Sequence, residues 1–247
     1  MKFLLSVLTI LFVSLCASAE TYVVCVGIGR YADARVPNLT KTENDAKAIA
    51  ELYKQGTKNV TVLIGRQATK QNIISALRRE FGKARPGDKI IFFFSGHGYK
   101  GGFCPFEMRS IPEGLQYNEV VDLMKASKAT DKIIFADACY SGAIRQNNTG
   151  NQTPNNYNFG NVMFFLSSRA GETSIESAVL AHGYFTKHLL RGLMGAADQN
   201  RDMTITAKEI FNYVSQGVIE DTQGRQHPVM WGNFSDNMAV VKYKKKY

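Results

Sequence analysis

The stretch KIIFFFSGHG, residues 89–98, decides the fold class of this chain. Its apolar residues follow one another without polar alternation, which is typical of a β-strand that is buried on both faces. The run continues directly into His97. A second run of the same kind, DKIIFAD at residues 131–137, is followed two residues later by Cys139. The sequence therefore predicts two buried strands, each followed closely by a side chain that can do chemistry.

The rest of the chain alternates between strand-like and helix-like patterns, which predicts a parallel sheet with helices on both faces and right-handed crossovers. We expect an α/β fold, a three-layer αβα sandwich around a mostly parallel central sheet of about six strands. Thr42 is expected to be the N-cap of the first helix. Further apolar runs lie at residues 21–28, 60–64 and 162–167, helical spacing covers 42–54, 69–83, 115–127, 183–197 and 207–218, and 236–244 is a candidate edge strand.

The first nineteen residues have the layout of a secretory signal peptide: a lysine, a short apolar run and small residues at the end. The apolar run is too short to favour a permanent membrane span. We expect cleavage after Ala19, so that Glu20 becomes the mature N-terminus. Lipid attachment at Cys16 is the alternative, but the bulky Leu15 before it argues against that. The sequence predicts a periplasmic or secreted protein without stable membrane insertion.

The mature chain is long enough for one domain, which we expect to span residues 20–247. Apolar residues make up 45% and charged residues 21%, as in ordinary globular proteins. The segment 145–160 is rich in Asn, Gly, Gln and Thr, and we predict that it is an exposed loop. It divides a larger portion, residues 20–144, from a smaller one, residues 161–247.

The charge of the chain and its cysteine content limit the kinds of partner and the disulfide bonds that we expect. The formal charge is +9, and part of it comes from a lysine-rich tail that begins at Lys242. No cluster interleaves aromatic and basic residues, so we expect no nucleic-acid partner. Cys25, Cys104 and Cys139 would remain after cleavage at Ala19, and an odd number leaves at least one thiol unbridged. Cys25 is expected to be buried and inert, and a bridge between Cys25 and Cys104 stays open.

The two strands that precede His97 and Cys139 suggest a nucleophilic site. If these strands are parallel neighbours, both side chains emerge at the carboxyl edge of the sheet, where sites form in open α/β folds. An imidazole beside a thiol can take its proton and leave a nucleophilic thiolate. The backbone N–H groups of Gly98 and Cys139 would face the same space and could stabilise an oxyanion. A backbone carbonyl could orient His97, because no third catalytic side chain is evident.

The motifs SGHG at 95–98 and DACYSG at 137–142, each after an apolar strand, resemble those of the caspase clan, and of its bacterial metacaspase-like branch in particular. The resemblance extends to Asn44-Asp45-Ala46 and to the segment 183–186, so it covers most of the mature chain. It implies a caspase-like sandwich and a cysteine endopeptidase that acts on proteins or peptides with His97 and Cys139. It implies no required cofactor, and we expect a monomer.

The resemblance also suggests a substrate preference. In metacaspase-like enzymes acidic residues line the pocket for the side chain before the cleaved bond, and the matching positions here are Asp45 and Asp137. Two partly buried carboxylates need positive partners, which an incoming Arg or Lys supplies. Cleavage after Asp would bring like charges together. Because the link between the two portions is often cut in this clan, self-cleavage of a zymogen after Arg145 is a further hypothesis.

The segment 198–209 partly matches a calcium loop. Asp198, Asn200, Asp202 and Glu209 occupy ligand positions, but Met203 stands where such a loop needs glycine. The alternative is a polar turn in which Asp198 or Thr206 caps a helix. Calcium dependence is therefore doubtful.

Two other functions compete with the peptidase. A non-catalytic interaction module of the same fold would carry an unproductive His97 and Cys139. A nucleotide-binding domain would need a glycine-rich phosphate loop after the first strand, but Gly27-Ile-Gly29 lacks the third glycine at the right spacing. His182, His188 and His227 show no spacing that suggests a partner.

Overall fold

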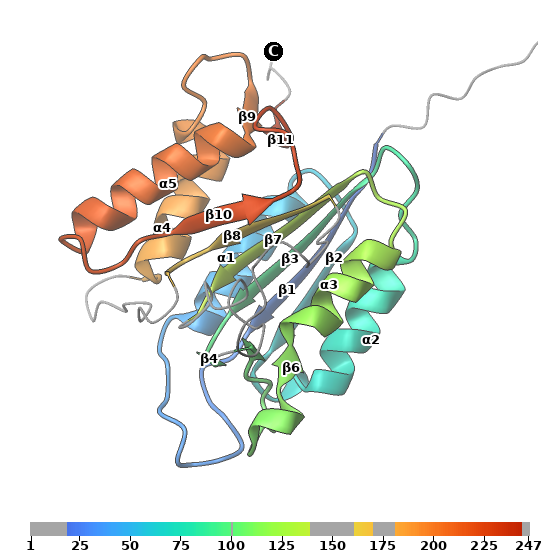
Figure 1. Ribbon diagram of the computed structural model, residues 1–247, viewed down its shortest axis with the longest axis vertical. Coiled ribbons are helices and arrows are strands. Elements are labelled where there is room, and N and C mark those ends of the chain that lie inside the picture. The colour runs from blue at the N-terminus through green and yellow to red at the C-terminus, as the bar shows by residue number, and fades with distance from the viewer. Residues whose placement is uncertain (1–18, 100, 139–160, 170–180, 244–247) are drawn as a thin grey trace, which may run out of the picture.

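A six-stranded sheet forms the centre of the computed structural model, which describes residues 19–99, 101–138, 161–169 and 181–243. Five strands run parallel, and only β10 at one edge runs antiparallel to its neighbour β8. The predicted mostly parallel sheet of about six strands is confirmed. In spatial order the strands are β10 (Val229–Gly232), β8 (Val162–Leu166), β7 (Asp131–Asp137), β3 (Lys89–Ser95), β1 (Thr21–Gly27) and β2 (Val60–Ile64) (Figure 1).

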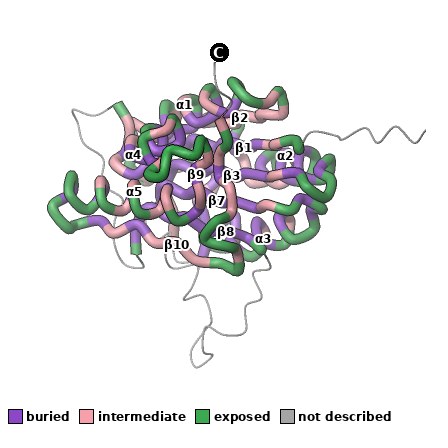
Figure 2. The backbone as a smooth tube through the Cα atoms, turned by 90° about the horizontal axis from the view of Figure 1, so that it is seen from above, coloured by how far each residue is buried: buried purple, intermediate pink, exposed green. Residues whose placement is uncertain are grey.

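Helices cover both faces of this sheet, which confirms the predicted three-layer αβα sandwich (Figure 1). Neighbouring residues of each strand point to opposite faces. Val24 and Val26 therefore pack into the layer of α2 (Lys70–Phe81) and α3 (Tyr117–Ala126). Val23 and Cys25 pack into the layer of α1 (Thr42–Lys54), α4 (Tyr184–Arg191) and α5 (Ala207–Asp221). Seen from above in Figure 2, the buried strands form the middle of the molecule.

Aromatic side chains stabilise the layer of α4 and α5. Phe165 of β8 is fully buried and contacts three other rings, with centroid distances of 6.2 Å to Phe135, 5.0 Å to Phe185 and 5.7 Å to Phe211. Truncating one such buried phenylalanine to alanine typically costs about 3–5 kcal/mol of stability. The packing of Phe165 against Phe185 thus holds β8 and the start of α4 in a fixed position relative to each other.

Within the described residues, two small sheets and three short helical segments accompany the central sheet. β4 (Gly98–Tyr99), β5 (Gly102–Phe103) and β6 (Leu115–Gln116) form one sheet, and β9 (Thr204–Thr206) with β11 (Ala239–Lys242) forms the other. The short segments are η1 (Gly65–Gln67), η2 (Ile111–Glu113) and the π-helical η5 (Gly192–Ala196).

The C-terminal run contains an edge strand, as expected, but that strand is shorter and belongs to a small two-stranded sheet. It forms β11 and pairs with β9, while β10 occupies the edge of the central sheet. Lys89 at the start of β3 holds this C-terminal segment, because its Nζ donates hydrogen bonds to the carbonyls of Ala239 and Val240. Burial lowers the pKa of Lys89 to about 8.

Several helix ends also differ from the sequence-based bounds. The N-cap of α1 is Lys41, so the prediction of Thr42 as its cap is wrong; Thr42 is the first helical residue and is buried. α3 begins two residues later than expected, because residues 115–116 pair as β6. The predicted helix 183–197 is α4 followed by η5, and α5 extends to Asp221.

The close approach of α1 to the sheet depends on glycine. A Cβ built on Gly27 at the end of β1 would lie 2.6 Å from the Thr42 carbonyl oxygen and 2.8 Å from the Ala46 Cβ. Any side chain there would force the start of α1 away from the strand. This glycine therefore serves helix packing, which brings Asp45 in the first turn of α1 to the end of the sheet.

At the opposite end of the sheet, the start of the described chain is attached to a buried carboxylate. The backbone N–H of Glu20 donates to Asp88 Oδ1 at 2.8 Å, and the N–H of Arg85 donates to Asp88 Oδ2 at 2.8 Å. Asp88 is only 7% exposed. The predicted signal peptide lies almost entirely outside the described residues, and within them no helix is long and apolar enough to cross a membrane.

Candidate active site

The carboxyl ends of β1, β3 and β7 lie side by side at one edge of the sheet. The register aligns Gly27 with Ser95, and Ser95 with Asp137. His97 follows β3 by two residues, and Cys139 follows β7 by the same number. The strand arrangement on which the predicted His97–Cys139 pair depends is therefore present. Cys139 itself lies outside the described residues, as does the predicted oxyanion contribution of its N–H group.

His97 is held by both its backbone and its ring. Its N–H donates to the Tyr31 hydroxyl at 2.7 Å, and its carbonyl accepts from the Cys104 N–H at 2.9 Å. Its ring lies against the Tyr31 ring at a centroid distance of 5.2 Å. The ring Nε2 lies 2.8 Å from the carbonyl oxygen of Pro37. The expectation that a backbone carbonyl orients His97 thus has a specific candidate.

This contact determines which nitrogen of His97 can act as a base. A carbonyl oxygen only accepts hydrogen bonds, so Nε2 must carry the ring proton. In the neutral ring Nδ1 is then unprotonated and able to accept a proton. When Nδ1 takes a proton, the Nε2–H donor remains bonded to Pro37 and stabilises the cation, as an orienting group does in other nucleophile–base pairs.

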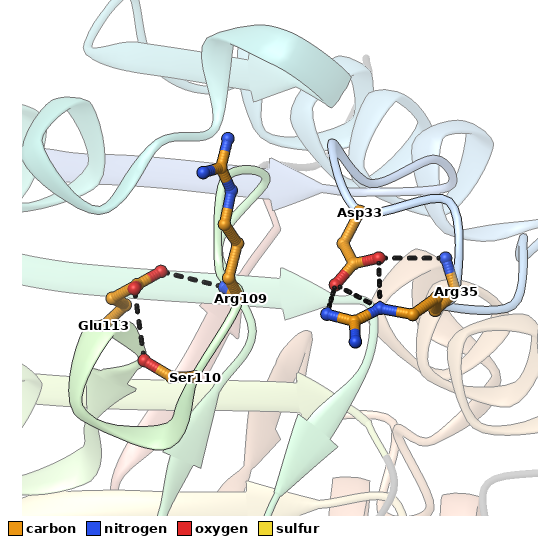
Figure 3. Close-up of polar contacts among 5 residues, drawn as sticks. All are labelled: Asp33, Arg35, Arg109, Ser110 and Glu113. Carbon is orange, nitrogen blue, oxygen red and sulfur yellow. Dashed lines mark hydrogen bonds and ion pairs between the residues drawn. The ribbon is translucent and has the colours of Figure 1, made fainter.

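The loop that carries Tyr31 and Pro37 has its own internal contacts (Figure 3). The Arg35 guanidinium makes a two-pronged contact with Asp33, with Nε–Oδ1 at 3.0 Å and Nη2–Oδ2 at 2.6 Å. These hydrogen bonds lower the pKa of Asp33 to about 2. Because the Arg35 side chain is 84% exposed, this ion pair contributes little to global stability. Its effect is local, since it braces the turn before Pro37.

Gly98 begins β4 immediately after His97 and pairs with Phe103 of β5. The small sheet therefore fixes the backbone on the far side of the histidine. Whether the Gly98 N–H faces a substrate carbonyl stays a prediction.

The start of the segment that leads to Cys139 is fixed by β8. The Ser167 N–H donates to the Ala136 carbonyl at 2.9 Å, and the Ser167 hydroxyl lies 3.2 Å from both the nitrogen and the carbonyl oxygen of Ala138. Gln226 Nε2 in turn donates to the Ser167 carbonyl at 2.8 Å. All these groups are buried, so the residue before Cys139 has a defined position.

Asp45 and Asp137, the two predicted pocket residues, both lie close to Gly183. A Cβ built on Gly183 would be 2.6 Å from Asp137 Oδ2 and 3.6 Å from Asp45 Oδ2. Both aspartates are buried, with 1% of Asp45 and 7% of Asp137 exposed. Two carboxylates, from α1 and from the end of β7, thus approach the backbone at position 183 so closely that a side chain there would collide with Asp137.

Each carboxylate has its own hydrogen-bond donors. Asp137 Oδ2 accepts from the Thr186 hydroxyl at 2.8 Å and from the Thr186 N–H at 3.2 Å. Asp45 Oδ2 accepts from the Ser95 hydroxyl at 3.1 Å, and Asp45 Oδ1 accepts from His182 Nδ1 at 2.8 Å. Burial raises the pKa of Asp45, and the hydrogen bonds from His182, Ser95 and the Gly183 backbone oppose this rise.

Sequence reasoning missed most of these supporting groups. Thr186 lies within the segment 183–186 that carried the family resemblance, so it could have been found. No local sequence pattern indicated a partner for His182, because its partner Asp45 is 137 positions away in the sequence. The Pro37 carbonyl is a backbone group and has no signature in the side chains.

Two other predictions from the sequence concern a self-cleavage loop and a possible disulfide. Arg145 and the loop 145–160 fall outside the described residues. Cys25 and Cys104 are described and are not bridged to each other; Cys25 is buried, and burial raises its pKa.

The calcium-like segment is described, and its carboxylates accept hydrogen bonds from their own loop. Asp198 accepts from the N–H of Asp202 and of Met203, and Glu209 accepts from Thr206. Met203 adopts a φ of 67°, the left-handed region that favours glycine. Thr206 is the N-cap of α5, as the alternative interpretation expected. Among the described residues, no group of three or more His, Cys, Asp and Glu side chains is arranged to hold a metal ion. Calcium binding stays an untested prediction.

Comparisons with known proteins agree with this fold. A family model of the caspase domain matches residues 21–238. The structure is similar to caspase-1 from Spodoptera frugiperda, with a TM-score of 0.64 and 15% identity over 92% of this chain and 93% of that one. A pro-sf-caspase-1 structure gives a TM-score of 0.59 and 12% identity over 90% and 94%. A structural-genomics target protein from Geobacter sulfurreducens gives 0.62 and 17% over 86% and 92%. No curated protein sequence matches the chain.

Proposed function

The chain belongs to the caspase domain family, and on that premise we propose that it is a cysteine endopeptidase that cleaves peptide bonds after arginine, and possibly after lysine. The observation that carries the proposal is the contact between His97 Nε2 and the Pro37 carbonyl. It leaves Nδ1 as the basic nitrogen at the edge of the sheet where β7 leads to Cys139. Within the described part of the chain Nδ1 accepts no hydrogen bond, as a general base before substrate binding requires.

The proposed reaction begins when His97 Nδ1 accepts the proton of the Cys139 thiol. The thiolate attacks the carbonyl carbon of the scissile bond, and the N–H groups of Gly98 and Cys139 bind the resulting oxyanion. His97 then gives its proton to the leaving amine, and the bond between carbonyl carbon and nitrogen breaks. Water hydrolyses the thioester that remains, releasing the acid and restoring the thiol. Throughout, the Pro37 carbonyl accepts from Nε2–H.

The two buried carboxylates support the preference for arginine. Asp45 and Asp137 are both buried, and both carboxylates approach the same place beside Gly183. Two buried carboxylates side by side favour a cationic side chain, and a guanidinium can bind a carboxylate through two parallel hydrogen bonds. A substrate with Asp before the cleaved bond would add a third negative charge to the same volume.

A panel of short fluorogenic peptides tests this proposal. The panel ends in Arg, Lys, Asp, Asn or Leu, and is read with and without calcium against Cys139→Ala and His97→Ala. We expect turnover after Arg, and we expect both variants to abolish it. Asp45→Asn or Asp137→Asn should reduce this turnover mainly by raising KM. Turnover after Asp would retain the catalytic pair and refute the acidic pocket. A wild-type chain with no turnover and no labelling of Cys139 by a thiol probe would favour the non-catalytic module.

We further propose that the protein is exported and that it cuts itself after Arg145. Residues 1–19 have the layout of a signal peptide. The polar segment 145–160 begins with Arg145, the type of residue after which the enzyme is proposed to cut. N-terminal sequencing of the exported protein tests the first, with Glu20 as the expected first residue. Intact mass before and after incubation, compared with Cys139→Ala, tests the second. An active enzyme that stays uncut would refute self-cleavage.

A further inference from the structure

The imidazole of His182 covers the carboxylate that the proposed substrate side chain needs. His182 Nδ1 lies 2.8 Å from Asp45 Oδ1, and the Asp45 side chain is only 2% exposed. The His182 side chain is 26% exposed, so it is the solvent-facing member of the pair. A guanidinium that approaches from solvent would therefore meet His182 before it reaches Asp45.

The other donors to Asp45 are arranged differently. Ser95 belongs to β3 and is 1% exposed, and the Gly183 N–H is part of the backbone that enters α4. Both donors are fixed by the fold and leave no route to the carboxylate. Among the donors to Asp45 in the described part of the chain, His182 is the partly exposed one that a rotation of its side chain can remove. Because the arriving guanidinium supplies its own N–H donors, the Asp45 oxygen does not stay unsatisfied after such an exchange.

The geometry points to His182 as a displaceable occupant of the acidic pocket: it satisfies Asp45 in the absence of substrate, and the arginine side chain of the substrate takes its place. This inference rests on the proposed function, and adds to it the residue that substrate must compete with. His182 is thus a specificity-determining residue. It admits a side chain that binds a carboxylate better than an imidazole does, and it disfavours neutral side chains that cannot replace its hydrogen bond.

The test compares three variants of the mature chain on a fluorogenic peptide ending in Arg. His182→Ala removes the competitor, so KM should fall by about tenfold, the value of one hydrogen bond to a partly exposed charged group, while kcat changes little. His182→Arg ties a guanidinium to the pocket and should raise KM. His182→Asn keeps a donor near the position of Nδ1 and should stay near the wild type. All variants are measured at the same pH.

The chain offers a matched control in a second His–Asp pair of the same length. His188 Nε2 lies 2.8 Å from Asp221 Oδ2, and His188 packs on α5 near Gly217, away from the acidic pocket. His188→Ala should lower the melting temperature without changing KM. This separates loss of a buried contact from loss of a competitor.

The outcomes distinguish this inference from the proposed function. A wild-type chain that does not cleave after Arg overturns the proposed function, and the inference with it. Cleavage after Arg with an unchanged or raised KM in His182→Ala overturns the inference alone. A lowered KM in His182→Ala together with a raised KM in His182→Arg supports it, because a merely structural histidine would not move KM in opposite directions.

Discussion

Replacing Gly183 by alanine would place a methyl group close to both carboxylates of the proposed pocket. The new Cβ would lie 2.6 Å from Asp137 Oδ2, closer than a carbon and an oxygen approach without repulsion. Either the Asp137 carboxylate must turn away, or the start of α4 must retreat. The first movement breaks the hydrogen bonds from the Thr186 hydroxyl and N–H at 2.8 and 3.2 Å. The second disturbs the packing of Phe185 against Phe165.

The size of the effect follows from these alternatives. Overpacking of a buried site typically costs about 1–3 kcal/mol, and a hydrogen bond to a charged group contributes about 1.5–3 kcal/mol. We expect the free energy of unfolding to fall by about 2–3 kcal/mol. For a chain of this length that corresponds to a drop in Tm of roughly 4–12 °C. A displaced Asp137 carboxylate would also bind the guanidinium less well, so KM for Arg peptides should rise by at least about tenfold.

Thermal unfolding and peptide turnover, measured on the same preparations, test both expectations. Gly56→Ala is the control, because a Cβ at that exposed position would contact only the Tyr53 carbonyl, at 3.8 Å. It should change neither quantity appreciably. If Gly183→Ala kept both the Tm and the KM of the wild type, the acidic side chains would not share the volume that we assign to the substrate.

Three further predictions concern the support of the site and its surroundings. Tyr31→Phe leaves the His97 N–H without its acceptor, so kcat should fall about two- to tenfold with little change in KM; an unchanged kcat would exclude a positioning role. Thr186→Val removes the hydroxyl donor to Asp137 and should lower stability in urea by about 1.5–3 kcal/mol, whereas Thr186→Ser should not; equal midpoints for both would contradict this. The pKa of Lys89 is lowered to about 8, so between that pH and 10.5 the unfolded chain binds the proton that the folded chain has lost. The stability of the wild type relative to Lys89→Met should therefore rise with alkaline pH, by up to about 3 kcal/mol, and a flat or falling difference would refute the assignment.

The sequence predicted the central sheet well because its strands are buried on both faces. Runs such as residues 89–95 and 131–137 carry no alternation and are bounded by polar residues, so only one interpretation is physically reasonable. The position of His97 at the sheet edge then followed from topology alone. β10 was missed because VMWG is short and only partly buried, and β4, β5 and β6 have two residues each.

Contacts between distant elements were out of reach of sequence reasoning. The pairing of Asp45 with His182 depends on how α1 and the segment before α4 meet over the sheet, and no local pattern encodes that meeting. The orientation of His97 depends on a backbone carbonyl, which every residue possesses. In contrast, the placement of Asp45 and Asp137 in one region could be expected, because both follow from the resemblance and from the shared sheet edge.

The hydrogen bond from the Glu20 N–H to Asp88 has a consequence for maturation. If export removes residues 1–19, this amide becomes a free ammonium group 2.8 Å from a buried carboxylate. The hydrogen bond from a neutral amide to a carboxylate then becomes an ion pair, and the processed chain should gain roughly 1.5–3 kcal/mol that the precursor lacks. Urea unfolding of a chain that begins at Glu20, against one that retains Ala19, would measure this gain, and Asp88→Asn should remove it. Equal stabilities would refute the idea. If the gain is found, removal of the signal peptide stabilises the folded state. The new N-terminal ammonium group would hold the start of β1 at the end of the sheet opposite the candidate active site.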